Sequence, residues 1–193
     1  MPISKYSGSS RRNYRGFSLL KIVVVMGIMA ILSAMMLGYS QRNSKQVLLA
    51  TTQVKLASIF SRAKALSIQS FFDSGSGGGD EVICAHGVRI DVDSQEMFIF
   101  QDIRDSGSCP RDPRQYDYSA TDDRELEGEL NKVSLADKTI KIESADSQYV
   151  IFIPPEPRVE FDGDNPNTSS VVITDGDMDL TVTVTKDGQI RME

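Results

Sequence analysis

The chain starts with a polar stretch that gives way to an uninterrupted apolar segment. Residues 22–37 carry no charge and contain one hydroxyl side chain, that of Ser33. Extended to residues 17–39, the segment matches a helix that spans the roughly 30 Å hydrocarbon layer of a bilayer. A buried helix of a soluble domain and a cleaved secretory signal are the alternatives. The segment is long for a secretory signal and lacks a small-residue cleavage site, so we expect a transmembrane helix.

The helical pattern continues beyond the apolar segment. One row at helical spacing contains Val47, Ala50, Val54 and Ala57, and an adjacent row contains Leu56, Ile59, Phe60, Ala63 and Leu66. No proline occurs between residues 17 and 72, which predicts a single helix of about 50 residues, with Gly38 as its weakest point. We expect the apolar stripe over residues 47–68 to pack against the rest of the domain.

The period of the pattern changes after the breaker Ser-Gly-Ser-Gly-Gly-Gly at residues 74–79. Short alternating runs then predict strands at residues 82–84, 88–92, 97–101, 139–143, 149–153, 158–161, 171–174, 180–185 and 189–192. Asp187-Gly188 supplies a hairpin turn before the last strand. Residues 104–130 contain few apolar side chains and are expected to form a long surface excursion. The order of elements predicts an α+β fold, with a long helix packed on an antiparallel sheet.

Charge divides the chain at the same place. The 193 residues carry a net charge of −6, but residues 1–16 contribute +4, residues 17–72 contribute +6 without a single acid, and the remainder contributes −16. The two parts are therefore expected to meet different environments. More basic residues precede the apolar segment than follow it closely, which predicts a cytoplasmic N-terminus and an exported C-terminal part. An acidic exported part gives no indication of nucleic-acid binding.

The junction between leader and apolar segment is the most specific motif. Residues 15–25 read Arg-Gly-Phe-Ser-Leu-Leu-Lys-Ile-Val-Val-Val, so a basic leader ends in Gly and an apolar helix begins at once with Phe. This junction resembles the class III signal of type IV pilins and type II secretion pseudopilins. The resemblance implies that a prepilin peptidase cleaves between Gly16 and Phe17 and methylates the new amine of Phe17. It also implies that Phe17, Leu20, Lys21 and Ile22 take part in assembly.

One residue departs from that family pattern. The family usually has Glu as the fifth residue of the mature chain, where it pairs with the N-terminal amine of a neighbouring subunit; this chain has Lys21. A second positive charge in an apolar filament core is unfavourable. We therefore expect a minor or tip position rather than that of the abundant repeating subunit.

Looser similarities extend the resemblance to the C-terminal part. Residues 84–90, residues 149–154 and the Asp187-Gly188 hairpin resemble the H-type minor pseudopilins of type II secretion and related minor pilins. The resemblance implies a pilin-like fold with a leader at 1–16, a transmembrane or filament-core helix at 17–40, an amphipathic continuation at 41–73 and an exported β-rich head at 74–193. The implied partners are a prepilin peptidase, other pilin or pseudopilin subunits and an inner-membrane assembly platform.

The cysteines follow from the expected export of the head. An oxidising compartment favours a disulfide between Cys84 and Cys109, and two free buried thiols are the alternative. Cys84 and His86 lie two residues apart on an expected strand and tend to share a face. No third group is placed to orient them, so we expect no catalytic pair.

Clustered carboxylates offer the remaining chemistry. Asp162, Asp164, Asp175 and Asp177 lie on tight acidic turns that do not meet the EF-hand pattern, so solvated turns are expected and calcium binding is the alternative. Paired carboxylates among Glu125, Glu127 and Glu129 have little apolar context to shift a pKa, which argues against an anchored hydrolase. We predict no catalytic residue, no metal and no cofactor.

Together these features predict a structural subunit rather than an enzyme. The expected function is that of a minor pseudopilin or minor pilin, single-pass in the bacterial inner membrane and assembled through its N-terminal helix. The alternative is a membrane-tethered periplasmic binding module that does not polymerise. The sequence does not distinguish a pilus from a secretion or DNA-uptake machine.

Overall fold

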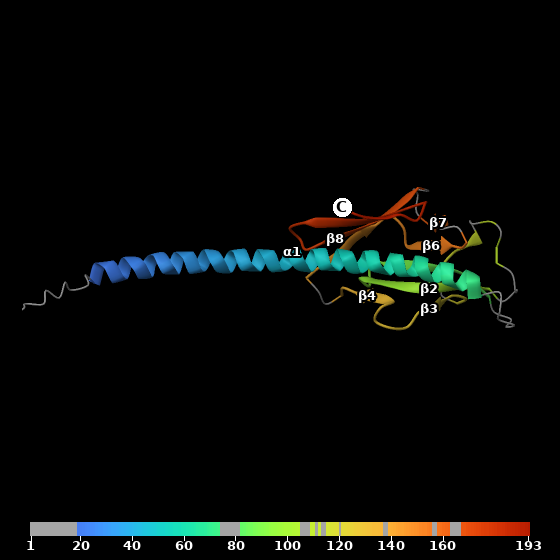
Figure 1. Cartoon of the computed structure of the whole chain (residues 1–193), viewed down its shortest axis with the longest axis horizontal. Coiled ribbons are helices and arrows are strands. Elements are labelled where there is room, and N and C mark those ends of the chain that lie inside the picture. Colours follow the sequence, from blue (N-terminus) through green and yellow to red (C-terminus); the bar gives the residue numbers. More distant parts are fainter. Residues whose placement is uncertain are drawn as a thin grey trace, which may run out of the picture. The chain divides into compact units, whose positions relative to one another are not determined.

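The computed structural model describes most of the chain beyond the leader. The described residues are 19–73, 82–104, 109–110, 112, 115–119, 121–136, 139–155, 158–162 and 167–193, without the side chains of 37–43 and 71–73. The chain divides into two compact units, Met1–Asn43 and Ser44–Glu193, which are considered separately. Helix α1 (Leu19–Asp73) runs through both units, and strands β1 to β10 belong to the second (Figure 1).

Helix α1 has 55 residues, which confirms the single long helix predicted from the absence of proline. It continues through Gly38 without a break. Helical hydrogen bonding on both sides therefore outweighs the roughly 1 kcal/mol by which glycine disfavours a helix.

The described strands form two antiparallel sheets, where the sequence led us to expect one. The larger sheet has the order β3-β2-β1-β6-β7, with β4 also paired to β2. The smaller sheet has the order β10-β9-β8-β5. The strand bounds in the larger sheet are β1 (Val82–Asp91), β2 (Glu96–Arg104), β3 (Arg124–Glu125), β4 (Lys132–Ser134), β6 (Tyr149–Ile153) and β7 (Arg158–Phe161). Those in the smaller sheet are β5 (Lys141–Ala145), β8 (Thr168–Thr174), β9 (Asp179–Thr185) and β10 (Ile190–Met192).

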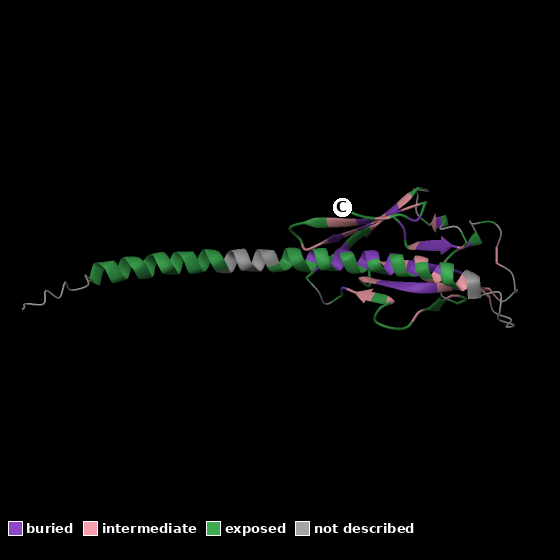
Figure 2. Cartoon of the chain, in the orientation of Figure 1, coloured by how far each residue is buried: buried purple, intermediate pink, exposed green. Residues whose placement is uncertain are grey.

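The C-terminal half of α1 and both sheets share one hydrophobic core. The core contains fully buried side chains from α1, from the larger sheet and from the smaller sheet, such as Phe60, Val88 and Ile173. Figure 2 shows this burial concentrated where α1 passes the sheets. The alternating burial of β8 and β9 leaves one face of the smaller sheet toward this core, as the Thr-Val alternation predicts.

Only one of the two predicted apolar rows on α1 is buried. The row of Leu56, Ile59, Phe60 and Ala63 lies in the core, and Leu66 packs against it. The other row does not behave as predicted, because Val47, Ala50 and Val54 are exposed and only its last member, Ala57, is buried. The two sheets cover an arc of the helix that is narrower than the apolar pattern, so part of that pattern faces outward.

The side-chain amides of Gln53 and Gln95 form hydrogen bonds between different elements of the second unit. Gln53 of α1 donates from Nε2 to the carbonyl oxygens of Thr181 (2.8 Å) and Glu193 (3.0 Å), and so holds the C-terminal strand pair. Gln95, in the turn between β1 and β2, donates to the carbonyl of Ile142 (2.9 Å) and accepts from its N–H (2.7 Å). Because Ile142 belongs to β5, this amide links the larger sheet to the smaller one.

The predicted surface excursion covers the outer face of the larger sheet. A second hydrophobic cluster on that face contains Phe98, Phe100 and Ile151 from the sheet and Tyr116 from the excursion. The ring of Tyr118 lies edge-on to Phe100, with centroids 4.9 Å apart. The segment 104–130 was predicted to be a polar surface excursion, but some of its aromatic side chains are buried against the sheet. The segment also contributes β3, which the pattern did not predict. Aromatic side chains spaced among Asp and Arg are the signal that this segment is partly buried.

The disulfide between Cys84 and Cys109 is present, as predicted. A register shift in β1 between Ile83 and Ala85 changes the faces of the residues around it. Cys84 joins the outer cluster, whereas His86 pairs with Gln101 and Phe152, and Phe152 lies in the core under α1. The expectation that Cys84 and His86 share a face is therefore wrong, and the bulge is the reason.

Candidate assembly helix

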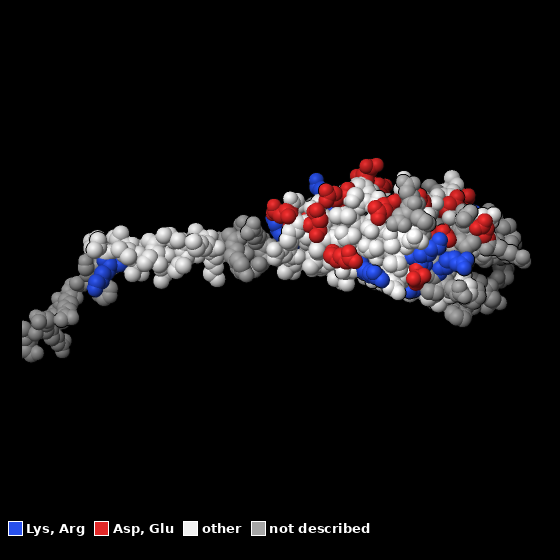
Figure 3. Space-filling model, turned by 90° about the horizontal axis from the view of Figure 1, so that it is seen from above, with Lys and Arg blue, Asp and Glu red and all other residues white. Residues whose placement is uncertain are grey.

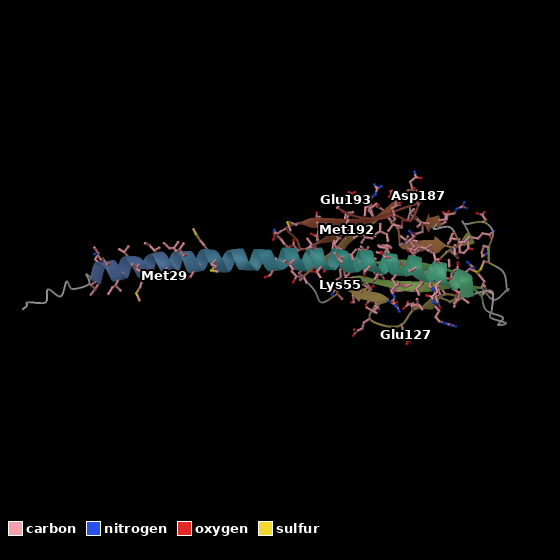
Figure 4. All side chains as sticks on the ribbon, viewed as in Figure 1. Met29, Lys55, Glu127, Asp187, Met192 and Glu193 are labelled. Atoms are coloured by element: carbon pink, nitrogen blue, oxygen red, sulfur yellow. A yellow bond between two sulfur atoms is a disulfide. The ribbon has the colours of Figure 1, made fainter. Side chains whose placement is uncertain are left out.

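The N-terminal half of α1 exposes every side chain that the structure describes there. Large apolar side chains among residues 19 to 36 are exposed, such as Leu20 (71% exposed) and Met29 (65% exposed, labelled in Figure 4). In the described part of the chain, Leu19–Met36 is the one helix long and apolar enough to cross a membrane. Exposed apolar surface on this scale marks contact with lipid or with other proteins.

One face of this segment carries a shallow groove of about 320 Å³. It is lined by Val25, Ile28, Met29, Leu32, Ser33 and Met36. Residues three and four apart in a helix lie on the same face, so these side chains form a continuous stripe. Methionine side chains adapt to the shape of a partner, which suits the stripe to packing against another helix.

Lys21 lies on the same face as the groove. It is one turn before Val25 and two turns before Ile28, at the i, i+4 and i+7 spacing. Between residues 19 and 36 it is the one charged residue, and it is exposed. In Figure 3 the described part of the apolar helix is white except for this basic group near its start.

The predicted assembly and processing residues are only partly within the described structure. Leu20, Lys21 and Ile22 occupy the first turns of α1 and are exposed. Gly16 and Phe17 lie outside the described residues. The cleavage and methylation expected there stay predictions.

A second exposed surface lies on the head half of α1. Val47 is 66% exposed and Val54 is 55% exposed. They lie seven residues apart and therefore on one face of the helix. On the opposite side of the helix, Lys45 pairs with Asp177 at 3.7 Å across an exposed contact. The head thus leaves an apolar helix face exposed on the side of α1 away from this ion pair.

The head contains a buried ion pair that sequence reasoning missed. Asp102 is fully buried on β2, and its Oδ1 lies 2.9 Å from Nε of Arg104. Burial raises the pKa of Asp102 to about 6, against the opposing effect of Arg104. Arg104 in turn reaches Asp117 (3.2 Å) and donates to the carbonyl of Gln115 (3.0 Å), both in the excursion. In the sequence, this pair could have been recognised from Asp102 and Arg104, which lie two residues apart at the end of an otherwise apolar strand.

His86 is a buried core histidine. It is 2% exposed, and desolvation by burial lowers its pKa to about 4. Its Nε2 lies 3.2 Å from Nε2 of Gln101. Cys84 is bonded to Cys109, so it offers no thiol to this imidazole.

The calcium candidates form tight turns. Asp175 accepts backbone N–H groups from Asp177 and Met178, both at 2.9 Å, and these hydrogen bonds lower its pKa. Asp162 accepts N–H groups from Gln148 (2.7 Å) and Tyr149 (3.2 Å). Asp164 lies outside the described residues. Among the residues the structure does describe, no three His, Cys, Asp or Glu side chains are grouped as metal ligands.

The described structure combines a folded α+β unit with an apolar helical extension. An α+β head is built on the second half of a helix whose first half is apolar enough to anchor a protein in a membrane. A solved structure with a similar fold is the minor pseudopilin EpsH from the type 2 secretion system of Vibrio cholerae, with 13% sequence identity and a TM-score of 0.48. The similarity covers 75% of this chain and 95% of that one. No protein-family model and no curated protein sequence matches the chain.

Proposed function

We propose that this chain is a minor pseudopilin of a type II secretion pseudopilus or a minor pilin of a type IV pilus. The observation that carries the proposal is the division of α1. Its second half supplies buried residues to the head core, whereas its first half exposes apolar side chains all round. An exposed apolar extension of this length is unfavourable in water and therefore unsuited to a soluble domain. A subunit that moves from a membrane into a filament uses it first to contact lipid and then to contact other helices.

The leader and the charge distribution give the proposed orientation. The basic leader of residues 1–16 stays in the cytoplasm, the apolar segment crosses the inner membrane once, and the acidic head is exported. The disulfide between Cys84 and Cys109 fits an oxidising compartment outside the cytoplasm.

Assembly in this proposal is helix on helix. Lipid tails and apolar side chains are similar environments, so a transmembrane helix leaves the bilayer only when other helices replace its lipid contacts. Among the exposed apolar surfaces of the described residues, the groove from Val25 to Met36 and the face at Val47 and Val54 suit those contacts. The proposed partners are a prepilin peptidase, other pilin or pseudopilin subunits and an inner-membrane assembly platform.

Processing tests the proposal directly. The full chain is co-expressed with a prepilin peptidase, and its N-terminus is determined by mass spectrometry. We expect a chain that begins at a methylated Phe17, and we expect Gly16→Ala to abolish the cleavage. Gly8→Ala is the matched control, since it changes a leader glycine away from the junction and leaves cleavage intact. An intact Met1 in the presence of an active peptidase would contradict the proposal.

Lys21 favours a second candidate function, a membrane-tethered periplasmic module that never polymerises. A cation is tolerated near the end of a membrane helix, where its side chain reaches the headgroups, and is disfavoured inside a filament. Single cysteines placed along residues 22–36 distinguish the two candidates in cells that assemble filaments. Crosslinks from these cysteines to pilin subunits support the filament subunit. A processed but uncrosslinked chain supports the tethered module.

A further inference from the structure

We propose that Lys21 selects the neighbour of α1 in an assembly, and that this neighbour is a helix with a carboxylate at the level of the first turn of α1. The inference rests on the proposed function, because it applies when the apolar segment leaves lipid for other helices. A second copy of this chain does not meet the requirement.

The position of Lys21 makes it part of the docking face. Lys21, Val25, Ile28, Leu32 and Met36 follow the i, i+4, i+7, i+11 and i+15 spacing, which keeps them on one side of a helix. The last four line the groove. A helix that fills the groove and continues for one more turn therefore meets the ammonium group of Lys21.

The ammonium group of Lys21 is solvated in a bilayer but not between packed helices. In a bilayer the long side chain of Lys21 reaches the headgroup region, because it lies near the start of the apolar segment. Between packed helices neither water nor headgroups replace that hydration, and an unpaired charge there is strongly unfavourable. A carboxylate on the neighbouring helix neutralises the ammonium and accepts its hydrogen bonds.

The carboxylate has to come from a different chain. Residues 1–72 of this chain contain no Asp and no Glu. Two copies aligned side by side would bring two ammonium groups together in a low-dielectric core, where like charges repel strongly. The sequence therefore disfavours homotypic packing of α1 and favours a partner that is acidic at this level.

Association between two versions of the full chain tests the inference without an identified partner. Wild type and Lys21→Glu are labelled at the C-terminus with a donor or an acceptor fluorophore and reconstituted in phosphatidylcholine vesicles, and energy transfer is measured. We expect mixed pairs of wild type and Lys21→Glu to associate about tenfold more tightly than wild type with itself, the size of a favourable interhelical polar contact. The leader charges are the same in every pair and cancel from the ratio.

Two variants complete the test. Lys55→Glu makes the same charge reversal on the head half of α1, where Lys55 is exposed (Figure 4), and it is expected to leave the affinity for wild type unchanged. Lys21→Met removes the charge and keeps an apolar side chain of similar length, so its pairing with wild type should fall well below that of Lys21→Glu. Equal association of wild type with itself and with Lys21→Glu would overturn the inference and indicate that headgroups alone satisfy Lys21.

The readouts separate this inference from the proposed function. Failure of cleavage at Gly16, or absence from filaments, rejects the filament subunit whatever the pairing preference. A processed chain that enters filaments and pairs equally well with both versions rejects only the role of Lys21.

Discussion

The phenyl ring of Phe100 lies directly over Gly87, its partner across β1 and β2. A Cβ atom placed on Gly87 would collide with the Cε1 and Cζ atoms of that ring, and it would also approach Cγ1 of Ile151 at 3.1 Å. The glycine thus leaves space for an aromatic side chain that anchors the outer hydrophobic cluster. Tyr118 from the excursion packs edge-on against the same ring, so the cover over this sheet face depends on the missing side chain.

Gly87→Ala is expected to destabilise the head by about 1–3 kcal/mol, because overpacking forces Phe100 off its preferred rotamer. Urea unfolding of the detergent-solubilised chain, followed by the near-ultraviolet circular dichroism of its tyrosines, measures the change. Combining Gly87→Ala with Phe100→Leu is the matched control, since the smaller side chain relieves the collision. A double variant no more stable than the sum of the two single changes would contradict this account.

The buried Asp102 makes stability depend on pH. Its pKa is raised to about 6 in the folded chain, so between pH 4 and 6 the folded state holds a proton that the unfolded state has lost. The contribution of Asp102 to stability therefore falls as pH rises through this window, by an amount on the order of 2 kcal/mol. Relative to wild type, Asp102→Asn should gain stability as pH rises from 4 to about 7, through the folded-state pKa, and then keep a constant difference. Asp117→Asn, which changes the exposed partner of Arg104, should track wild type, and an identical response of both variants would argue against the assignment.

His86 acts with the opposite sign over a similar range. Its pKa is lowered to about 4 in the folded chain, so between pH 4 and 6.5 the unfolded state holds a proton that the folded state has lost. Its contribution to stability therefore rises with pH across this window. Relative to wild type, His86→Gln should lose stability as pH rises from 4 to 6.5. Because Asp102 opposes this trend, wild type alone is uninformative, and the difference between each variant and wild type is the quantity to compare. A His86→Gln difference that does not change with pH would contradict the assignment.

The long helix, most strands and the disulfide could be predicted because each depends on local pattern. The helix follows from periodicity without proline, and β6 and β7 were predicted with their observed bounds. The pairing of Cys84 with Cys109 was predicted from the expected export of the head. These features need no knowledge of the packing between elements.

The errors concern features that depend on tertiary contacts. The bulge near Ile83 places Cys84 and His86 on opposite faces of the larger sheet, and no residue pattern indicates it. β3 and β4 are two and three residues long and exist through pairing with β2 rather than through their own propensity. Burial of Val47 and Val54 was expected from the apolar period, but the area that two sheets cover decides which part of the stripe is buried.

Gln53 connects the helix to the end of the chain, and its loss should loosen that end specifically. Its Nε2 donates to the carbonyls of Thr181 and Glu193, residues that also exchange backbone hydrogen bonds with each other at 2.8 and 3.0 Å. Gln53→Ala removes two hydrogen bonds to part-buried carbonyls, which corresponds to about 1–3 kcal/mol. We expect faster amide hydrogen exchange in β9 and β10 and unchanged exchange in β1 and β6.

Gln69→Ala, which changes an exposed glutamine on the same helix, is the control and should leave hydrogen exchange in every strand unaffected. Equal acceleration in both sheets would mean that Gln53 supports the whole core, and unchanged exchange in β9 and β10 would mean that the two hydrogen bonds do not hold the C-terminal strand.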